Sequence, residues 1–136
     1  GIKMNPKKYS KDELESITRK FTKALYLYLG EDKDIPAPDM GTNSQTMDWM
    51  MDTYNMFNNR HTKGVFTGKS IECGGSNGRE EATGRGITMC IKKWADDNNT
   101  DLHGKTFMLQ GYGNVGCFTA CCSNESSEEL DTSLWR

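Results

Sequence analysis

The sequence predicts an α/β protein, and three observations carry that prediction. Two early segments place apolar residues at three- and four-residue steps, as amphipathic helices do. The segment from Lys105 to Gln110 has the apolar character of a buried strand. It runs directly into a glycine-rich turn, residues 111–116, of the kind that links a strand to a helix. The small size of 136 residues allows one domain or parts of two.

The first helix is predicted to begin after Ser10. Ser10 and Glu13 form a capping box, in which the serine hydroxyl accepts from the Glu13 amide and the glutamate reaches back. Gly30 is the expected stop. Two prolines, Pro36 and Pro38, exclude a helix from the segment that follows. The apolar face of this first helix consists of Leu14, Ile17, Phe21, Leu25 and Tyr28.

Two further helices are expected downstream. One runs from near Ser44 to Phe57, and residues 64–78 form a loop with one short strand at Val65–Phe66. The next helix starts near Arg79 and contains Gly84 and Gly86, each of which costs about 1 kcal/mol relative to alanine. Glycines inside a helix pattern usually have a packing or binding reason. The apolar residues of the two helices are Met47, Met50, Met51, Tyr54 and Phe57 in the first and Ile87, Cys90, Ile91 and Trp94 in the second.

The turn after the expected strand matches the G-x-G-x-x-G fingerprint of dinucleotide-binding domains. Gly111 would make the tight turn, Gly113 would let a phosphate approach the backbone, and Gly116 would let helix and strand pack closely. The following helix is expected to be short, a turn or two over residues 117–122, before an acidic and atypical tail, residues 123–136. A ribose-binding acid would fall at Glu128, Glu129 or Asp131. The alternative is a glycine-rich turn without a ligand.

Asp39 is the best candidate for acid–base chemistry. Its backbone is held by the preceding Pro36-Ala-Pro38, which suits a group that must meet a substrate proton within hydrogen-bond reach. Its apolar neighbours predict desolvation, which would raise the pKa of the Asp39 carboxyl. The alternative is an aspartate that starts a turn or caps a helix, and local sequence alone favours it.

A second candidate region is the glycine-rich stretch 74–86. Such a lead into a helix N-terminus favours anions, so that Arg79 could hold a carboxylate bidentately and Thr83 could offer a hydroxyl to an amide group. A flexible loop with solvated arginines is the alternative. The two histidines, His61 and His103, lack neighbouring ligands, so no metal site is predicted.

Composition excludes several classes of protein. The 17 Lys+Arg and 19 Asp+Glu give a net charge of −2, which argues against nucleic-acid binding by bulk charge. No apolar run is long enough to span a bilayer. The five cysteines include no C-x-x-C pair, which favours reduced thiols of an intracellular protein over a disulfide framework.

Together these blocks resemble the glutamate dehydrogenases, in that family's order and spacing over about residues 1–116. The block from Pro36 to Thr42, Pro-Ala-Pro-Asp-Met-Gly-Thr, and the block Ala82-Thr-Gly-Arg-Gly86 are the most specific. They also favour this family over the leucine and phenylalanine dehydrogenases. The other matching stretches are 1–6, 9–21, 34–35, 52–54, 67–69, 74–76, 78–79, 104–107 and 110–116.

The resemblance implies a fold and a reaction. Residues 1–78 would be the C-terminal part of a substrate (dimerisation) domain, and residues 79–136 the start of a truncated Rossmann-like dinucleotide-binding domain. The family interconverts L-glutamate with 2-oxoglutarate and ammonia, uses NAD or NADP, and forms homo-oligomers, typically hexamers. Asp39 would shuttle protons at the amino group, Arg79 would lie beside the substrate carboxylate, and Thr83 would meet the nicotinamide amide. Asn114 and Val115 would line the dinucleotide.

The sequence also departs from the family pattern. The catalytic lysine of the family lies in a block upstream of Gly1, and the expected helix after Gly116 is short. We therefore expect a fragment of a dehydrogenase that is inactive alone, with a half-built sheet prone to aggregation. The alternative is a non-catalytic remnant that binds nucleotide or docks on a full-length subunit.

Overall fold

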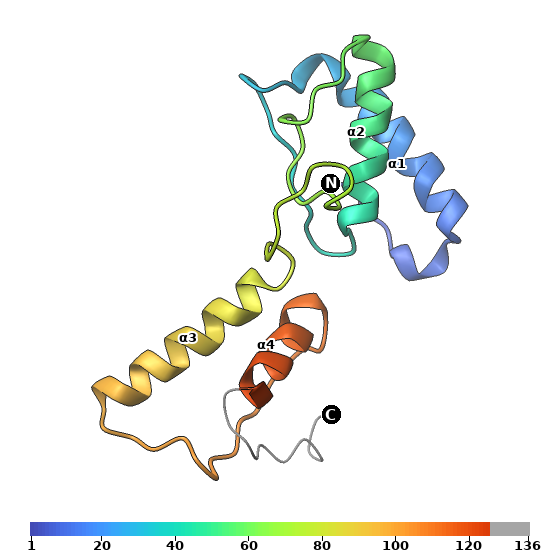
Figure 1. Cartoon of the computed structure of the whole chain (residues 1–136). Coiled ribbons are helices and arrows are strands. Elements are labelled where there is room, and N and C mark those ends of the chain that lie inside the picture. Colours follow the sequence, from blue (N-terminus) through green and yellow to red (C-terminus); the bar gives the residue numbers. More distant parts are fainter. Residues whose placement is uncertain (126–136) are drawn as a thin grey trace. The chain divides into compact units, whose positions relative to one another are not determined.

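The computed structural model describes residues 1–125, and side chains through residue 122. The chain divides into two compact units, unit 1 from Gly1 to Asn77 and unit 2 from Gly78 onward, and each is described by itself (Figure 1). The assignment of a substrate domain and a dinucleotide-binding domain to 1–78 and 79–136 stays a prediction. The acidic residues expected near the ribose, Glu128, Glu129 and Asp131, lie outside the described residues.

Helix α1 (Lys11–Leu25) follows a short 3₁₀ helix, η1 (Pro6–Lys8), and leads into a second one, η2 (Tyr26–Tyr28). The capping box is confirmed: the Glu13 amide donates to Ser10 Oγ over 3.3 Å, and the Ser10 amide donates to Glu13 Oε2 over 2.8 Å. The helix ends before the predicted stop at Gly30. The tighter 3₁₀ turn changes the angle between successive residues, so Tyr28, expected on the apolar face, is 65% exposed.

Helix α2 (Ser44–Asn58) begins where predicted, and packs against α1 (Figure 1). Asn43 caps it by accepting from the Thr46 amide over 3.1 Å, and Asn59 ends it in the left-handed conformation, with φ of 51°. The hydroxyl of Tyr54 donates to the carbonyl of Leu29 over 3.3 Å inside the core. The buried core of unit 1 consists of Leu29, Met47, Met50, Tyr54, Val65 and Phe66.

The predicted strand at Val65–Phe66 is wrong, although both side chains are buried. These residues belong to a loop that is bonded to the proline segment rather than to a strand. The amide of Thr67 donates to the carbonyl of Pro36 over 3.1 Å. The buried pair thus holds the segment that leads to Asp39 against the core of unit 1.

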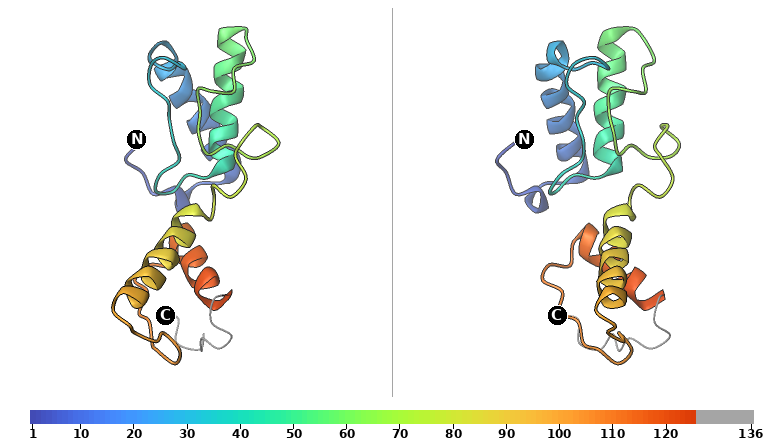
Figure 2. Two further views of the ribbon diagram at one scale, coloured as in Figure 1. Left: turned by 60° about the vertical axis from the view of Figure 1, so that its left-hand side comes forward. Right: turned by 90° about the vertical axis from the view of Figure 1, so that its left-hand side faces the viewer.

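Unit 2 is a pair of packed helices, α3 (Ala82–Asp97) and α4 (Asn114–Glu125), which lie side by side in both views of Figure 2. Helix α3 starts at Ala82, one turn later than the predicted start near Arg79. Helix α4 covers more residues than the turn or two expected, because it packs against α3 through Phe118 and Thr119, which lie next to Gly84. A partner helix therefore stabilises a segment of weak intrinsic helix preference.

The predicted strand Lys105–Gln110 is not formed. In the part of the chain that the structure describes there are no strands, only an isolated bridge between Leu29 and Asp34. A strand needs neighbouring strands to satisfy its backbone groups, and the described residues offer none to 105–110. The described part is therefore helical, and the sheet expected of an α/β domain is absent from it. Among the same residues no helix is long and apolar enough to cross a membrane.

Candidate functional site

Asp39 opens a tight turn that runs to Thr42. The Thr42 amide donates to the Asp39 carbonyl over 3.0 Å, and Gly41 has φ of 78°, the conformation that a type II turn needs at its third residue. The Thr42 hydroxyl accepts from the Asp39 amide over 2.7 Å and donates to the Asp39 carbonyl over 2.8 Å. The Met40 amide donates to Asp39 Oδ1 over 2.7 Å. Both the backbone and one carboxylate oxygen of Asp39 are thereby fixed.

The turn is also held from outside. A Cβ added at Gly41 would lie 2.8 Å from Cγ of Pro6, so η1 packs directly on the turn. On the other side, Thr67 binds the carbonyl of Pro36 through its amide, as described above, and through its hydroxyl over 3.4 Å. The predicted rigidity of Asp39 thus has a structural basis that includes Thr42 and Pro6, which the sequence analysis did not single out.

The predicted desolvation of Asp39 is not present within unit 1. Its side chain and those of Ala37 and Met40 are exposed, because the two half-buried prolines face the unit while the turn projects outward. Asp39 starts a turn, which was one of the two alternatives to a catalytic role. It does not cap α2, because the cap of that helix is Asn43. A turn-forming role leaves the carboxylate accessible, so it does not exclude proton transfer.

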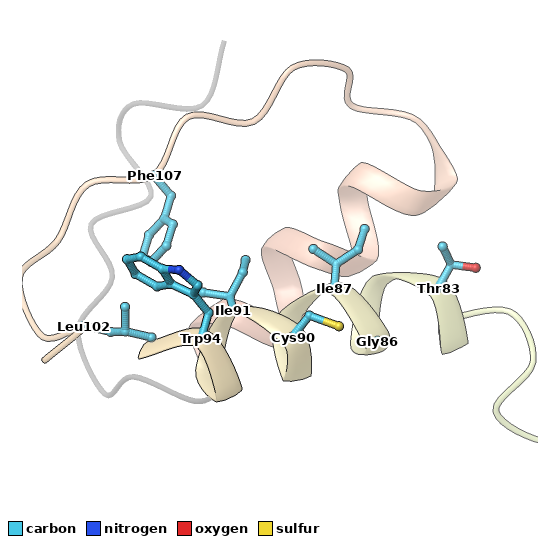
Figure 3. Close-up of a pocket in the computed structure, with 8 residues that line it drawn as sticks. All are labelled: Thr83, Gly86, Ile87, Cys90, Ile91, Trp94, Leu102 and Phe107. Atoms are coloured by element: carbon cyan, nitrogen blue, oxygen red, sulfur yellow. The ribbon is translucent and has the colours of Figure 1, made fainter. Parts of the chain in front are cut away.

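In unit 2, Arg79 and Thr83 are both exposed near the beginning of α3. Arg79 precedes the helix, and Thr83 is in its first turn. Thr83 lies at one end of a groove of about 690 Å³, and Trp94 and Phe107 lie at the other end (Figure 3). The residues that line the groove are mostly apolar: Thr83, Gly86, Ile87, Cys90, Ile91, Trp94, Leu102 and Phe107.

The glycines of the fingerprint turn have distinct surroundings. Gly111 has φ of 93°, which an L side chain rarely adopts. A Cβ at Gly116 would lie 2.1 Å from the Gly111 carbonyl oxygen, whereas a Cβ at Gly113 would meet nothing within 4 Å. Asn114 and Val115 are exposed in the first turn of α4. The loop therefore closes tightly on the helix and leaves open space at Gly113, where the fingerprint requires access for a phosphate.

Sequence reasoning missed a contact between the loop and α4. The side chain of Tyr112 hydrogen-bonds to that of Cys117, and this contact, with the neighbouring charge of the same thiol, raises the pKa of the exposed Tyr112 hydroxyl. In the sequence, only the spacing indicates this contact: Tyr112 lies in the glycine-rich turn, five positions before Cys117. Together with the close approach of Gly116, it joins the turn to the helix.

Comparison with protein families matches both units. Residues 1–56 match the dimerisation domain of the Glu/Leu/Phe/Val dehydrogenases. Residues 74–132 match the glutamate/leucine/phenylalanine/valine dehydrogenase family model, and include Arg79, Thr83 and the whole of the fingerprint turn. The chain belongs to the Glu/Leu/Phe/Val dehydrogenase family. The resemblance to glutamate dehydrogenase stated from the motifs is thereby confirmed, with a dimerisation domain followed by the start of the catalytic domain.

Curated relatives are glutamate dehydrogenases of both coenzyme types. The chain is 46% identical over 120 residues to glutamate dehydrogenase of Thermotoga maritima, covering 88% of this chain and 29% of the relative. It is 43% identical to a cryptic catabolic NAD-specific glutamate dehydrogenase of Bacillus subtilis, over 88% of this chain and 28% of that one. An NADP-specific glutamate dehydrogenase of Halobacterium salinarum is 45% identical over 88% and 29% of the two chains. The chain thus spans less than a third of the length of these relatives.

Solved structures agree with the sequence relatives. A hetero-hexameric glutamate dehydrogenase from Thermus thermophilus, in a leucine-bound form, matches 90% of this chain and 30% of its own, with a TM-score of 0.84 at 38% identity. Glutamate dehydrogenase from Peptoniphilus asaccharolyticus matches 90% of this chain and 31% of its own, with a TM-score of 0.70 at 40% identity.

Proposed function

We propose that this chain supplies a proton-transfer carboxylate and a dinucleotide loop to an NAD(P)-dependent glutamate dehydrogenase, which interconverts L-glutamate with 2-oxoglutarate and ammonia. The geometry of the Gly111–Gly116 loop carries the proposal. The loop combines a positive φ at Gly111, open space at Gly113 and a closely packed Gly116 at the start of α4. Family membership supports the reaction class, and relatives of both coenzyme types support NAD or NADP as cofactor.

The loop suits a dinucleotide for electrostatic reasons. The first amides of α4 are not bonded within the helix, and the helix dipole makes this end favourable for phosphate. Gly113 would allow the pyrophosphate close to the backbone, and the exposed Asn114 and Val115 would line it. Thr83, exposed in the first turn of α3, would bond the nicotinamide amide. Bound nicotinamide supplies the hydride chemistry, so these residues bind and orient only.

Arg79 and Asp39 would bind the substrate and exchange a proton with it, respectively. Arg79 would bind a substrate carboxylate through paired, charge-assisted hydrogen bonds. Asp39 would take a proton from the amino group in one direction and return it in the other, including at the carbinolamine. Its exposed carboxylate is accessible for that transfer. Oligomerisation through the dimerisation domain, with a hexamer as in the Thermus thermophilus structure, belongs to the same proposal.

Titration of the purified chain with NADH and NADPH tests the loop. We expect saturable chemical-shift changes in NMR spectra at residues 111–116. Gly113→Ala should abolish them without loss of helicity, because the added Cβ meets no protein atom within 4 Å but occupies the phosphate approach. Met89→Ala, at a side chain that is 61% exposed on α3 and outside the groove, is the matched control. Unchanged spectra, or unchanged binding in Gly113→Ala, would contradict the proposal.

A second candidate is favoured by one observation. The apolar groove on α3 is lined by Trp94, which is 58% exposed, and lies beside the unpaired segment 105–110. Such a surface suits a chain that binds nucleotide or docks on a full-length subunit without catalysing the reaction. Mixing the chain alone with glutamate and either coenzyme, while following the absorbance of the reduced cofactor, should show no turnover. Clear reduction would show that the chain is sufficient for catalysis.

A further inference from the structure

We infer that Thr42 is the positioning residue of Asp39, and that the Met40 amide, which binds Oδ1, leaves Oδ2 as the oxygen that exchanges the proton. This rests on the proposed role of Asp39. A group that transfers a proton needs a fixed position, because the donor and acceptor atoms must come within hydrogen-bond reach. Asp39 is exposed on this turn, so hydrogen bonds must supply much of what fixes its position.

One hydroxyl bonds both backbone groups of Asp39, and the carbonyl also accepts from the Thr42 amide over 3.0 Å. Thr42 Oγ1 accepts from the Asp39 amide and donates to the Asp39 carbonyl, over 2.7 Å and 2.8 Å. A hydroxyl has one proton to give and lone pairs to accept, so it can form both bonds at once. Valine at this position would keep the shape of the side chain and lose both bonds. Serine would keep both.

The two carboxylate oxygens of Asp39 have different surroundings. Oδ1 accepts from the Met40 amide over 2.7 Å, which ties the side-chain torsion of Asp39 to the backbone of the turn. Within the described part of the chain, no hydrogen bond reaches Oδ2. In the proposed reaction the proton of the substrate ammonium group therefore passes to Oδ2, which leaves a neutral amine and a carboxylic acid, and it returns in the reverse direction.

The other contacts that hold the turn in place do not involve the Asp39 carboxylate. Gly41 adopts the positive φ and contacts Pro6, and Thr67 holds Pro36. Loss of the Thr42 hydroxyl should therefore release Asp39 without unfolding unit 1. This separates positioning from a merely structural contribution to stability.

NMR spectroscopy of the whole chain tests the inference through the Asp39 side-chain torsion and amide exchange. We expect one Asp39 rotamer in the unmodified chain and in Thr42→Ser. In Thr42→Val we expect Hα–Hβ couplings averaged over rotamers and an Asp39 amide that exchanges about tenfold faster, in line with one lost hydrogen bond. Resonances of the buried Phe66 should not move in either variant, which shows that the core is intact.

Averaged couplings in the unmodified chain, or a single rotamer that persists in Thr42→Val, would overturn the inference. Failure of Thr42→Ser to restore the single rotamer would do the same. These results do not depend on coenzyme binding. An absence of NAD(P)H binding would contradict the proposed function and leave the positioning of Asp39 unaffected, so the two failures are distinguishable.

Discussion

At the scale of single residues, two glycines of the same helix have opposite surroundings. A Cβ at Gly84 would lie 2.7 Å from Phe118 Cβ and from the Thr119 amide nitrogen. A Cβ at Gly86 would meet nothing within 4 Å. Gly84 therefore lies at a close contact between α3 and α4, whereas Gly86 lines the groove. The prediction that glycines in this helix have a packing reason is confirmed for Gly84.

Alanine substitution should separate these two roles. Gly84→Ala should destabilise unit 2 by about 1–3 kcal/mol, because the added methyl group forces the helices apart. Gly86→Ala should stabilise α3 by up to about 1 kcal/mol, the usual gain from replacing glycine inside a helix. Thermal unfolding followed by circular dichroism measures both. Equal or greater stability of Gly84→Ala relative to Gly86→Ala would show that the helices do not pack through this residue.

At the scale of elements, the start of α1 is a charged cap whose strength depends on pH. The pKa of the Glu13 carboxyl is lowered by a hydrogen bond from the Ser10 amide and a second from the Ser10 hydroxyl. A lowered pKa in the folded state stabilises the fold above the pKa of the unfolded chain, about 4.3. That contribution is lost as the pH falls through the lower folded value.

Glu13→Gln should therefore lower the melting temperature at pH 7 and have a smaller effect at pH 3. Melting curves of the unmodified chain and the variant at both pH values provide the measurement. Ser10→Ala is the control: it removes the hydroxyl and costs about 1 kcal/mol as a lost cap, and it should also reduce the pH dependence that Glu13 contributes. An effect of Glu13→Gln that is equal at both pH values would contradict this account.

Elements that depend on neighbours within a few residues were predictable from sequence. The cap at Ser10, the start of α2 at Ser44 and the positive φ of Gly111 all follow from local spacing and residue type. The strand Lys105–Gln110 was not correctly predicted, because a strand depends on pairing partners that local sequence does not specify. The length of α4 was underestimated because packing on α3, rather than helix preference, stabilises it.

For the candidate site, sequence identified the residue types but not their supports. The prolines before Asp39 pointed to it in the sequence. The two hydrogen bonds between the Thr42 hydroxyl and the Asp39 backbone depend on the turn geometry at Gly41, which the sequence did not specify. The expected desolvation of Asp39 followed from apolar neighbours in sequence, but Ala37 and Met40 are exposed beside it and Pro38 is only half-buried. Neighbours along a turn project in different directions, so sequence proximity did not predict burial.

At the scale of the whole molecule, the two units bear different surfaces. Unit 1 has a buried core, whereas unit 2 exposes the groove that Trp94 lines, and its Met108, outside that lining, is 98% exposed. Exposed apolar surface of this kind promotes association. We therefore expect the chain to associate through this groove.

Trp94→Lys should reduce self-association of the chain, because a charge in the groove must be desolvated when another surface covers it. Sedimentation velocity at increasing concentration measures the effect, with circular dichroism to verify that helicity is retained. Leu27→Lys replaces a side chain that is 74% exposed in unit 1 and serves as the control, with little effect expected. Equal effects of the two substitutions would show that the groove is not the associating surface.

We propose above that this chain holds a working proton-transfer aspartate and dinucleotide loop of a glutamate dehydrogenase. The test is a chimera of the Thermotoga maritima enzyme. In it, the 120 matched residues of this chain replace the corresponding stretch of that enzyme, to which they are 46% identical. Glutamate-dependent coenzyme reduction is measured in the chimera and in its Asp39→Asn and Asp34→Asn variants. We predict an active chimera, a loss of about 10²–10⁴-fold in kcat for Asp39→Asn, and little change for Asp34→Asn. A folded, oligomeric chimera without activity, or one whose activity survives Asp39→Asn, would contradict the claim.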